Sequence, residues 1–151
     1  MPRTRTGEDR PSRSREGVTV AGRHAPLSRA AVRRAATSVL RGERRAASLS
    51  LTFLGRARMR ELHARWKGIP EPTDVLAFRL PLPGGALAGD IYICPFVAAR
   101  EARARGLPLR QELLRLVVHG VLHVLGYDHP RTGRAASAMW RRQERYVSGL
   151  R

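Results

Sequence analysis

Cysteine, lysine and acidic residues are scarce in this chain of 151 residues. Cys94 is the only cysteine, so no disulfide can form within the chain, and its apolar surroundings indicate a small core residue. Lys67 is the only lysine, and every other basic residue is arginine. The chain has 12 acidic and 29 basic residues, which gives a formal net charge of +17. Such a charge favours a polyanionic partner, either nucleic acid or an anionic membrane.

A long hydrophobic run is also missing. The longest uncharged apolar stretch, LVVHGVLHVLGY, is far shorter than the roughly 20 residues that cross a bilayer. The first residues, MPRTRTGEDRPSRSREG, contain no apolar segment and do not have the pattern of a secretory signal. These absences predict a cytoplasmic protein without a membrane partner.

Composition divides the chain into two parts. Residues 1–17 are rich in Arg, Ser, Pro and Gly and contain no large apolar group, which predicts a disordered basic arm. A solvated tail is the simpler interpretation of this arm, and contact with RNA is the alternative. Residues 18–151 are predicted to form one domain.

Hydrophobic patterns within the domain alternate between strand and helix, which predicts the α+β class. Expected strands cover residues 18–22, 48–54, 74–80 and 86–94, and expected helices cover 29–41, 56–66, 96–105, 109–125 and 132–148. The short LPGG connection implies that the last two strands pair antiparallel. The helix over 109–125 is apolar on nearly every side from Leu113 onward, which predicts burial in the middle of the domain. The last helix is expected to turn its Arg and Glu side chains outward.

Three of the five histidines lie within eleven residues, HGVLHVLGYDH. His119 and His123 are four residues apart, so their side chains leave a helix on the same face. Gly126 can end that helix and return the chain, which brings His129 to the same point. Three imidazoles with an open fourth position are typical of a catalytic zinc site, although nickel, copper and iron also accept imidazole. A hydrogen-bonded core histidine is the simpler alternative, but it explains one histidine better than three.

The same spacing occurs in metzincin proteases, which carry a glutamate general base directly after the first histidine. This chain has Gly120 at that position, so peptide hydrolysis by that mechanism lacks its proton acceptor. Gly120 is instead expected to let another backbone or a substrate come close to the helix.

The stretch HGVLHVLGYDH resembles the signature of the YbeY-type endoribonucleases, which are bacterial rRNA maturation factors. PTDVLAF and GDIYI resemble the two other sequence blocks of this family, in the same order. Met139 and Glu144 fit its C-terminal part, and the resemblance covers residues 18–149.

This resemblance implies a mixed four-stranded sheet surrounded by helices, and one divalent metal ion on His119, His123 and His129. It implies single-strand-specific cleavage of rRNA precursors in 3′-end maturation of the small ribosomal subunit and in ribosome quality control, with a metal-bound water as nucleophile. A non-catalytic ribosome-assembly factor, which binds rRNA and uses the metal structurally, is the alternative. Asp128 is expected either to orient a metal ligand or to act as a base.

One part of the chain departs from the family pattern. Where the family has an asparagine and then a Tyr-Arg pair ahead of PTDVLAF, this chain has His63, Trp66 and Lys67. The family's arginine is thought to act on the substrate phosphate, so we predict that Lys67 contacts phosphate as a point charge, without the paired donors of arginine. A surface position is expected for His63, and core packing, rather than stacking on a base, for Trp66.

Overall fold

The computed structural model describes residues 17–128 and 137–150, which form a single sheet with helices packed around it. The strands are β1 (Gly17–Gly22), β2 (Ser48–Phe53), β3 (Val75–Pro81) and β4 (Leu87–Ile93), and the helices are α1 (Arg29–Glu43), α2 (Arg56–Lys67), α3 (Pro95–Arg105), α4 (Leu109–Val124) and α5 (Ala138–Leu150). The strand order is β1-β2-β4-β3. β2 runs parallel to β1 and β4, whereas β3 is antiparallel to β4. The predicted α+β class and mixed four-stranded sheet are confirmed.

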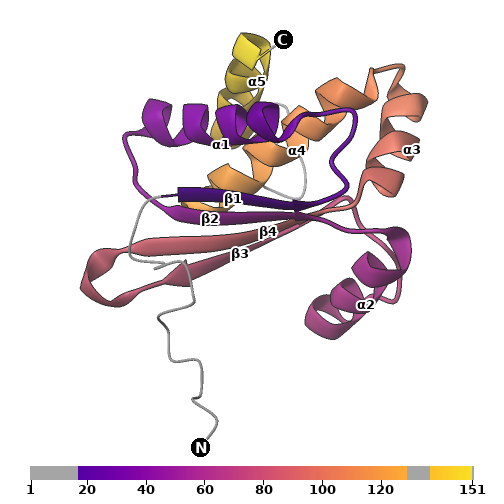
Figure 1. Ribbon diagram of the computed structural model, residues 1–151, viewed down its shortest axis with the longest axis horizontal. Coiled ribbons are helices and arrows are strands. Elements are labelled where there is room, and N and C mark those ends of the chain that lie inside the picture. The colour runs from indigo at the N-terminus through magenta and orange to yellow at the C-terminus, as the bar shows by residue number, and fades with distance from the viewer. Residues whose placement is uncertain (1–16, 129–136, 151) are drawn as a thin grey trace, which may run out of the picture.

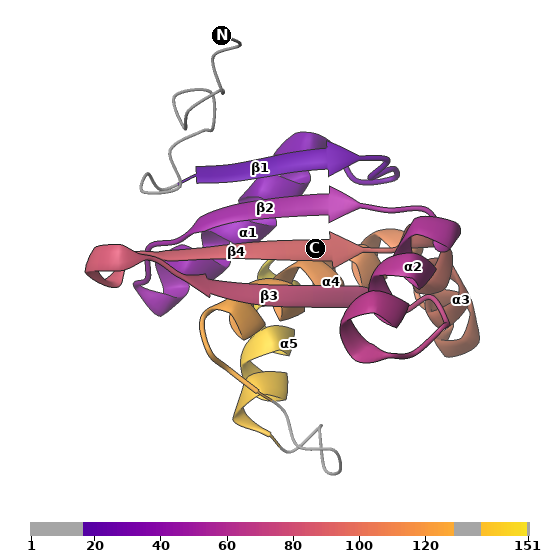
Figure 2. The ribbon, with the colours of Figure 1, turned by 90° about the horizontal axis from the view of Figure 1, so that it is seen from below.

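Helices α1, α4 and α5 cover one face of the sheet (Figure 1). Figure 2 shows the opposite face, where α2 lies across one end of the strands. Helix α4 contacts β3, β4 and the three helices α1, α3 and α5, so it is the central helix that was expected. No helix among the described residues is long and apolar enough to cross a bilayer.

Local sequence signals explain several element boundaries. The Ser28 hydroxyl accepts a hydrogen bond from the Ala31 N–H at 3.0 Å, as expected of an N-cap residue at the start of α1. In β2, Leu49, Leu51 and Phe53 are buried while the residues between them are half-buried, which confirms the predicted alternation. Cys94 is fully buried, as its apolar surroundings indicated.

Helix α4 packs closely on β4 because glycines stand where the two elements meet. A Cβ atom on Gly120 would lie 2.6 Å from Cγ2 of Ile91 in β4. The prediction that a backbone or a substrate approaches this glycine is wrong, because the side chain of Ile91 occupies the space. A glutamate at this position, as in metzincins, would collide with β4.

The last helix differs from its prediction in two respects. Residues 132–136 of the expected helix lie outside the described residues, and Ser137 precedes α5, where its hydroxyl accepts a hydrogen bond from the Trp140 N–H. The expectation that its glutamate points outward is wrong, because Glu144 forms an ion pair with the buried Arg115 of α4. At the other end of the chain Gly17, predicted to belong to the basic arm, begins β1, and residues 1–16 lie outside the described residues.

A buried carboxylate joins the helical layer to the segment after α4. Glu43, at the end of α1, accepts hydrogen bonds from the hydroxyls of Tyr127 and Tyr146 and from Nη1 of Arg142. Burial alone would raise the pKa of Glu43, but these hydrogen bonds outweigh it and hold the pKa below its usual range. The network fixes Tyr127, which lies one residue after the glycine that ends α4.

Candidate active site

A pocket of about 520 Å³ lies between β3 and α4, with contributions from the end of α2 and from α5. The polar side chains on it include Lys67, Asp74, Arg105, Glu112, Arg115, His119, His123 and Gln143. Three of the four residues predicted to act in function, Lys67, His119 and His123, therefore line one pocket. The fourth, His129, lies outside the described residues.

The two histidines project from one face of α4, as their spacing of four residues predicts. Both are half-buried, and their ring centroids are 4.6 Å apart with an angle of 73° between the planes. Gly126 follows the helix with a φ of 104°, in the region that favours glycine. Its N–H donates to the His123 carbonyl and the next N–H donates to the Leu122 carbonyl, which ends α4 and turns the chain back as expected.

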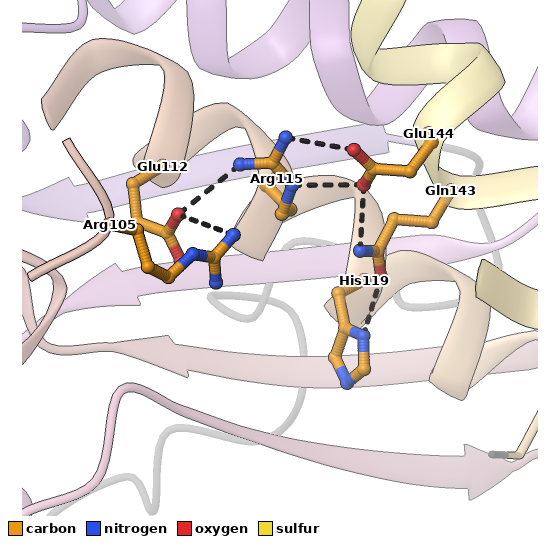
Figure 3. A network of polar contacts seen from close by, with 6 residues as sticks. All are labelled: Arg105, Glu112, Arg115, His119, Gln143 and Glu144. Atoms are coloured by element: carbon orange, nitrogen blue, oxygen red, sulfur yellow. Dashed lines mark hydrogen bonds and ion pairs between the residues drawn. The ribbon is translucent and has the colours of Figure 1, made fainter. Parts of the chain in front are cut away.

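Gln143 determines which nitrogen of His119 carries the proton (Figure 3). The amide nitrogen of Gln143 donates to Oε2 of Glu144 at 3.1 Å, so its Oε1 faces His119. This oxygen lies 2.7 Å from Nδ1 of His119 and can only accept a hydrogen bond. The proton of a neutral His119 is therefore on Nδ1, and Nε2 keeps its lone pair.

A buried arginine holds Glu144 in place. Arg115 donates from Nε and Nη2 to the two carboxylate oxygens of Glu144, at 2.9 and 2.8 Å, and from Nη1 to Glu112 at 3.2 Å (Figure 3). The side chain of Arg115 is only 7% exposed and that of Glu112 only 3%, so both charges depend on each other for compensation. The hydrogen bond to Glu144 raises the pKa of Arg115 against the effect of burial.

The donor set on α4 has the chemistry of metal ligands. An imidazole that donates Nδ1–H to an oxygen acceptor, and so keeps the lone pair on Nε2, is the form in which histidine binds metal ions in proteins. The described residues contain no cluster of three or more His, Cys, Asp or Glu side chains placed to hold a metal ion. Two neighbouring imidazoles on one helix fit such an ion as a partial ligand set.

Positive charge borders the same pocket. Lys67 ends α2 and is exposed, and Arg105 ends α3 with 43% of its side chain exposed and Nη2 3.6 Å from Glu112. Trp66, beside Lys67, is 58% exposed with its ring 5.4 Å from that of Phe78, so the expectation of core packing is wrong. An exposed aromatic ring next to a cationic pocket can stack on a nucleic-acid base.

His63 and Asp128 were also singled out from the sequence. His63 is half-buried on α2, and its Nδ1 is 2.7 Å from the Glu71 carbonyl oxygen. Asp128 is exposed. Asp74, which sequence reasoning missed, lines the pocket, and its Oδ1 accepts the Val75 N–H at 2.8 Å.

Gln143 was also missed, although the sequence contains a signal for it. The buried residues of α5 are Met139, Gln143 and Val147, which follow one another at intervals of four. A polar residue on an otherwise apolar helix stripe needs a buried partner. Here that partner is His119.

The profile of the family described as Endoribonuclease YbeY matches residues 21–151. The chain belongs to this family. Two curated relatives, each described as Endoribonuclease YbeY, come from Mycolicibacterium gilvum and Rhodococcus opacus and are 47% and 46% identical over 95 residues. Each alignment covers 56% of this chain and 53% of the relative, so the chain matches about half the length of these curated YbeY proteins.

The solution structure of TM1509 from Thermotoga maritima has a similar fold. It superposes with a TM-score of 0.64 at 25% sequence identity, and the match covers 89% of both chains. This likeness extends over most of the sheet and helices that surround the pocket, well beyond the stretch aligned with the curated YbeY relatives.

Proposed function

We propose that this YbeY-family chain is a metal-dependent endoribonuclease that cleaves single-stranded RNA. The observation that carries the proposal is the pocket itself, where the imidazoles of His119 and His123 line the same space as Lys67 and Arg105. The net charge of +17 agrees with a polyanionic substrate. The family description, Endoribonuclease YbeY, names the same class of reaction.

The metal proposed is one divalent ion, with zinc as the first choice. His119 and His123 would hold it together with His129, and three imidazoles leave a position open for substrate or water. A bound divalent ion would supply Lewis acidity and lower the pKa of a coordinated water. Ribose 2′-hydroxyl attack is the alternative chemistry for the same pocket.

The chain's own residues have separate roles in this proposal. Lys67 binds a phosphate oxygen of the scissile group and offsets the negative charge that grows there. Arg105 offers a second cation at the same rim, since its ion pair with Glu112 is long and half-exposed. Gln143 keeps the proton of His119 on Nδ1, so that Nε2 remains a ligand.

The substrate proposed is a precursor of the small-subunit rRNA 3′ end, with a further role in ribosome quality control. RNA is expected to enter the pocket as a single strand, because unpaired bases can stack on an exposed ring such as Trp66. A non-catalytic assembly factor would use the same basic surface without cleavage.

Cleavage by His123→Ala tests the proposal against the assembly-factor alternative. Wild type, His123→Ala and the control His24→Ala are purified side by side and incubated with a single-stranded precursor of the small-subunit rRNA 3′ end. His24 lies in the segment after β1, and its ring contacts that of Phe53 in β2, away from the pocket. Its replacement therefore removes a histidine without changing α4. Metal content and RNA cleavage are expected to fall to background in His123→Ala and to persist in the control.

The products then distinguish the two chemistries. A 3′-hydroxyl with a 5′-phosphate fits attack by water, whereas a cyclic phosphate would identify the ribose hydroxyl as the nucleophile. Equal cleavage by wild type and folded His123→Ala would point to a contaminating nuclease. No cleavage by metal-loaded wild type would favour the assembly factor.

Lys67→Arg is expected to retain or raise the rate of RNA cleavage. Arginine keeps the positive charge at the rim of the pocket and adds paired N–H donors that match phosphate oxygens. Lys67→Met is the matched control, because it keeps an unbranched side chain of nearly the same length and removes the charge. The measurement is kcat/KM for the single-stranded precursor at constant metal content. A large loss in Lys67→Arg with metal content unchanged would contradict the role given to this residue.

A further inference from the structure

A second concave surface lies at the other edge of the sheet. Two adjoining hollows, of about 710 and 550 Å³, follow α1 and the edge strand β1, and they share Arg33, Thr37 and Arg41. We call this surface the arginine groove, after the arginines that line it: Arg29, Arg33, Arg34, Arg41, Arg44 and Arg45. Figure 2 shows β1 and β3 at opposite edges, so the groove and the histidine pocket are separate sites.

The charge of the arginine groove is not neutralised within the described residues. All six arginines are exposed, and no carboxylate of this part of the chain forms an ion pair with them. Glu43 is the only acidic residue of α1, and its carboxylate is already bound by Tyr127, Tyr146 and Arg142. The groove therefore presents a continuous positive surface to solvent.

Helix stability does not explain these arginines. Arg29, Arg33 and Arg34 lie in the first two turns of α1, where the positive end of the helix dipole disfavours cations, and the first turn contains no acidic residue. Arg29 and Arg33 are also four residues apart, a spacing at which like charges destabilise a helix. Arg33 donates from Nε to the Val18 carbonyl at 3.2 Å, but no acidic partner accounts for the charge at these positions, which points to an external anion.

Arg44 provides a second, independent observation. It follows the last turn of α1 with φ 54° and ψ 44°, a left-handed conformation that is unfavourable for a residue with a side chain. Glycine is the usual residue there, and this chain uses Gly68 and Gly106 at the ends of α2 and α3. The strained arginine adds a cation to the groove that glycine would not supply.

We propose that the arginine groove binds backbone phosphates of an RNA strand whose cleavage site lies in the histidine pocket. This inference rests on the proposed function. Arginine side chains with a hydroxyl beside them, here that of Thr37, are common phosphate donors. A concave surface without exposed large apolar side chains suits a nucleic-acid backbone better than a membrane. Because three strand spacings of about 4.8 Å separate the sheet edges, only a strand long enough to pass round the domain can contact both sites.

RNA binding by charge-deleted variants tests this proposal. All variants are made in a His123→Ala background, so that the RNA stays intact, and titrated with a long fluorescent uridine homopolymer over a range of salt concentrations. Arg33→Ala/Arg41→Ala removes two groove charges, and Arg103→Ala/Arg110→Ala removes the same charge from exposed positions on α3 and α4. The double variant Arg33→Ala/Arg41→Ala, called the groove pair, is expected to bind RNA more weakly. It is also expected to reduce the slope of log K against log salt by about 0.7 for each lost phosphate contact. The double variant Arg103→Ala/Arg110→Ala, called the control pair, is expected to keep a slope near that of the His123→Ala protein.

Arg44→Gly supplies a test that unfolding cannot imitate. Its thermal stability is expected to stay the same or rise, because glycine relieves the left-handed strain, while RNA affinity falls. Equal losses in the groove and control pairs, or no loss in the groove pair, would overturn the proposal. Binding to anionic phospholipid vesicles that the groove pair abolishes, with RNA affinity unchanged, would assign the groove to a membrane instead.

Cleavage of a short single strand separates this proposal from the previous one. With His123 intact, the groove pair is expected to cleave short RNA at the wild-type rate, because the pocket is untouched. If wild type cleaves no RNA at all, the proposed catalytic function fails, yet the binding titrations still decide whether the groove holds RNA.

Discussion

Replacing Arg115 by leucine is expected to lower the free energy of unfolding by about 3–5 kcal/mol. Arg115 compensates two carboxylates, Glu112 and Glu144, and the side chain of Glu112 is only 3% exposed. Removal of the arginine leaves that charge buried without its closest partner, because the remaining cation, Arg105, is 3.6 Å away and half-exposed. Urea unfolding of wild type and Arg115→Leu measures the difference.

Arg105→Leu is the matched control for this variant. It removes an arginine from the same carboxylate, but from a side chain that is 43% exposed, so the expected loss is below about 1 kcal/mol. A loss of that small size in Arg115→Leu as well would contradict the view that Arg115 compensates a buried charge.

The difference in stability between wild type and Arg115→Leu is expected to depend on pH. Burial alone would raise the pKa of Glu144, but hydrogen bonds from Arg115 and Gln143 outweigh it and hold the pKa below its usual range. Such a group stabilises the fold fully above its unfolded pKa, and the stabilisation is lost as pH falls through the lowered folded value. In Arg115→Leu, acid instead protonates the uncompensated carboxylates. The difference in stability between the two proteins is therefore expected to shrink as pH falls below the ordinary carboxyl pKa of about 4.

Most of the fold was predictable because the relevant signals are local. The alternation in SLSLTFL, the capping hydroxyl of Ser28 and the apolar run of α4 each specify an element within a few residues. The antiparallel pairing of β3 and β4 followed from the short connection between them. These features depend on neighbours along the chain, so one sequence is enough to read them.

The errors concern side chains whose partners are distant in sequence. Glu144 appeared suited to an exposed helix face, but its partner Arg115 is 29 residues earlier on a helix packed against it. The space beside Gly120 is taken by Ile91 of a neighbouring strand, which no pattern within α4 reveals. Trp66 remains exposed although tryptophan is usually largely buried. Each case was decided by tertiary packing.

The candidate site was predictable to the extent that its spacing is helical. His119 and His123 lie on one face of α4 because they are four residues apart, and Lys67 reaches the same pocket through the arrangement of α2 and β3. His129 stays a prediction, since it lies outside the described residues. Gln143 approaches His119 from a different helix, 24 residues later, so it became visible only in the folded chain.

Gln143→Leu is expected to weaken metal binding by about 10–100-fold, the usual effect of removing the group that orients a histidine ligand. This expectation rests on the metal proposed for the pocket. Leucine has a similar size but cannot accept the Nδ1–H of His119, so the proton is free to move to Nε2, the nitrogen that must bind the metal. Chelator competition at constant pH gives the affinity. The ¹⁵N shifts of the His119 ring in the metal-free protein are expected to change from a single Nδ1–H tautomer to a mixture.

Gln143→Glu is the conservative variant, because a carboxylate still accepts the Nδ1–H although it loses the hydrogen bond to Glu144. We expect its metal affinity to lie between those of wild type and Gln143→Leu, with the Nδ1–H tautomer retained. A merely structural role for Gln143 would lower stability without changing the tautomer. If Gln143→Leu kept both the wild-type tautomer and the wild-type affinity, another contact would have to orient His119. The hydrogen bonds that link Arg115 and Glu144 to Gln143 would then serve stability alone.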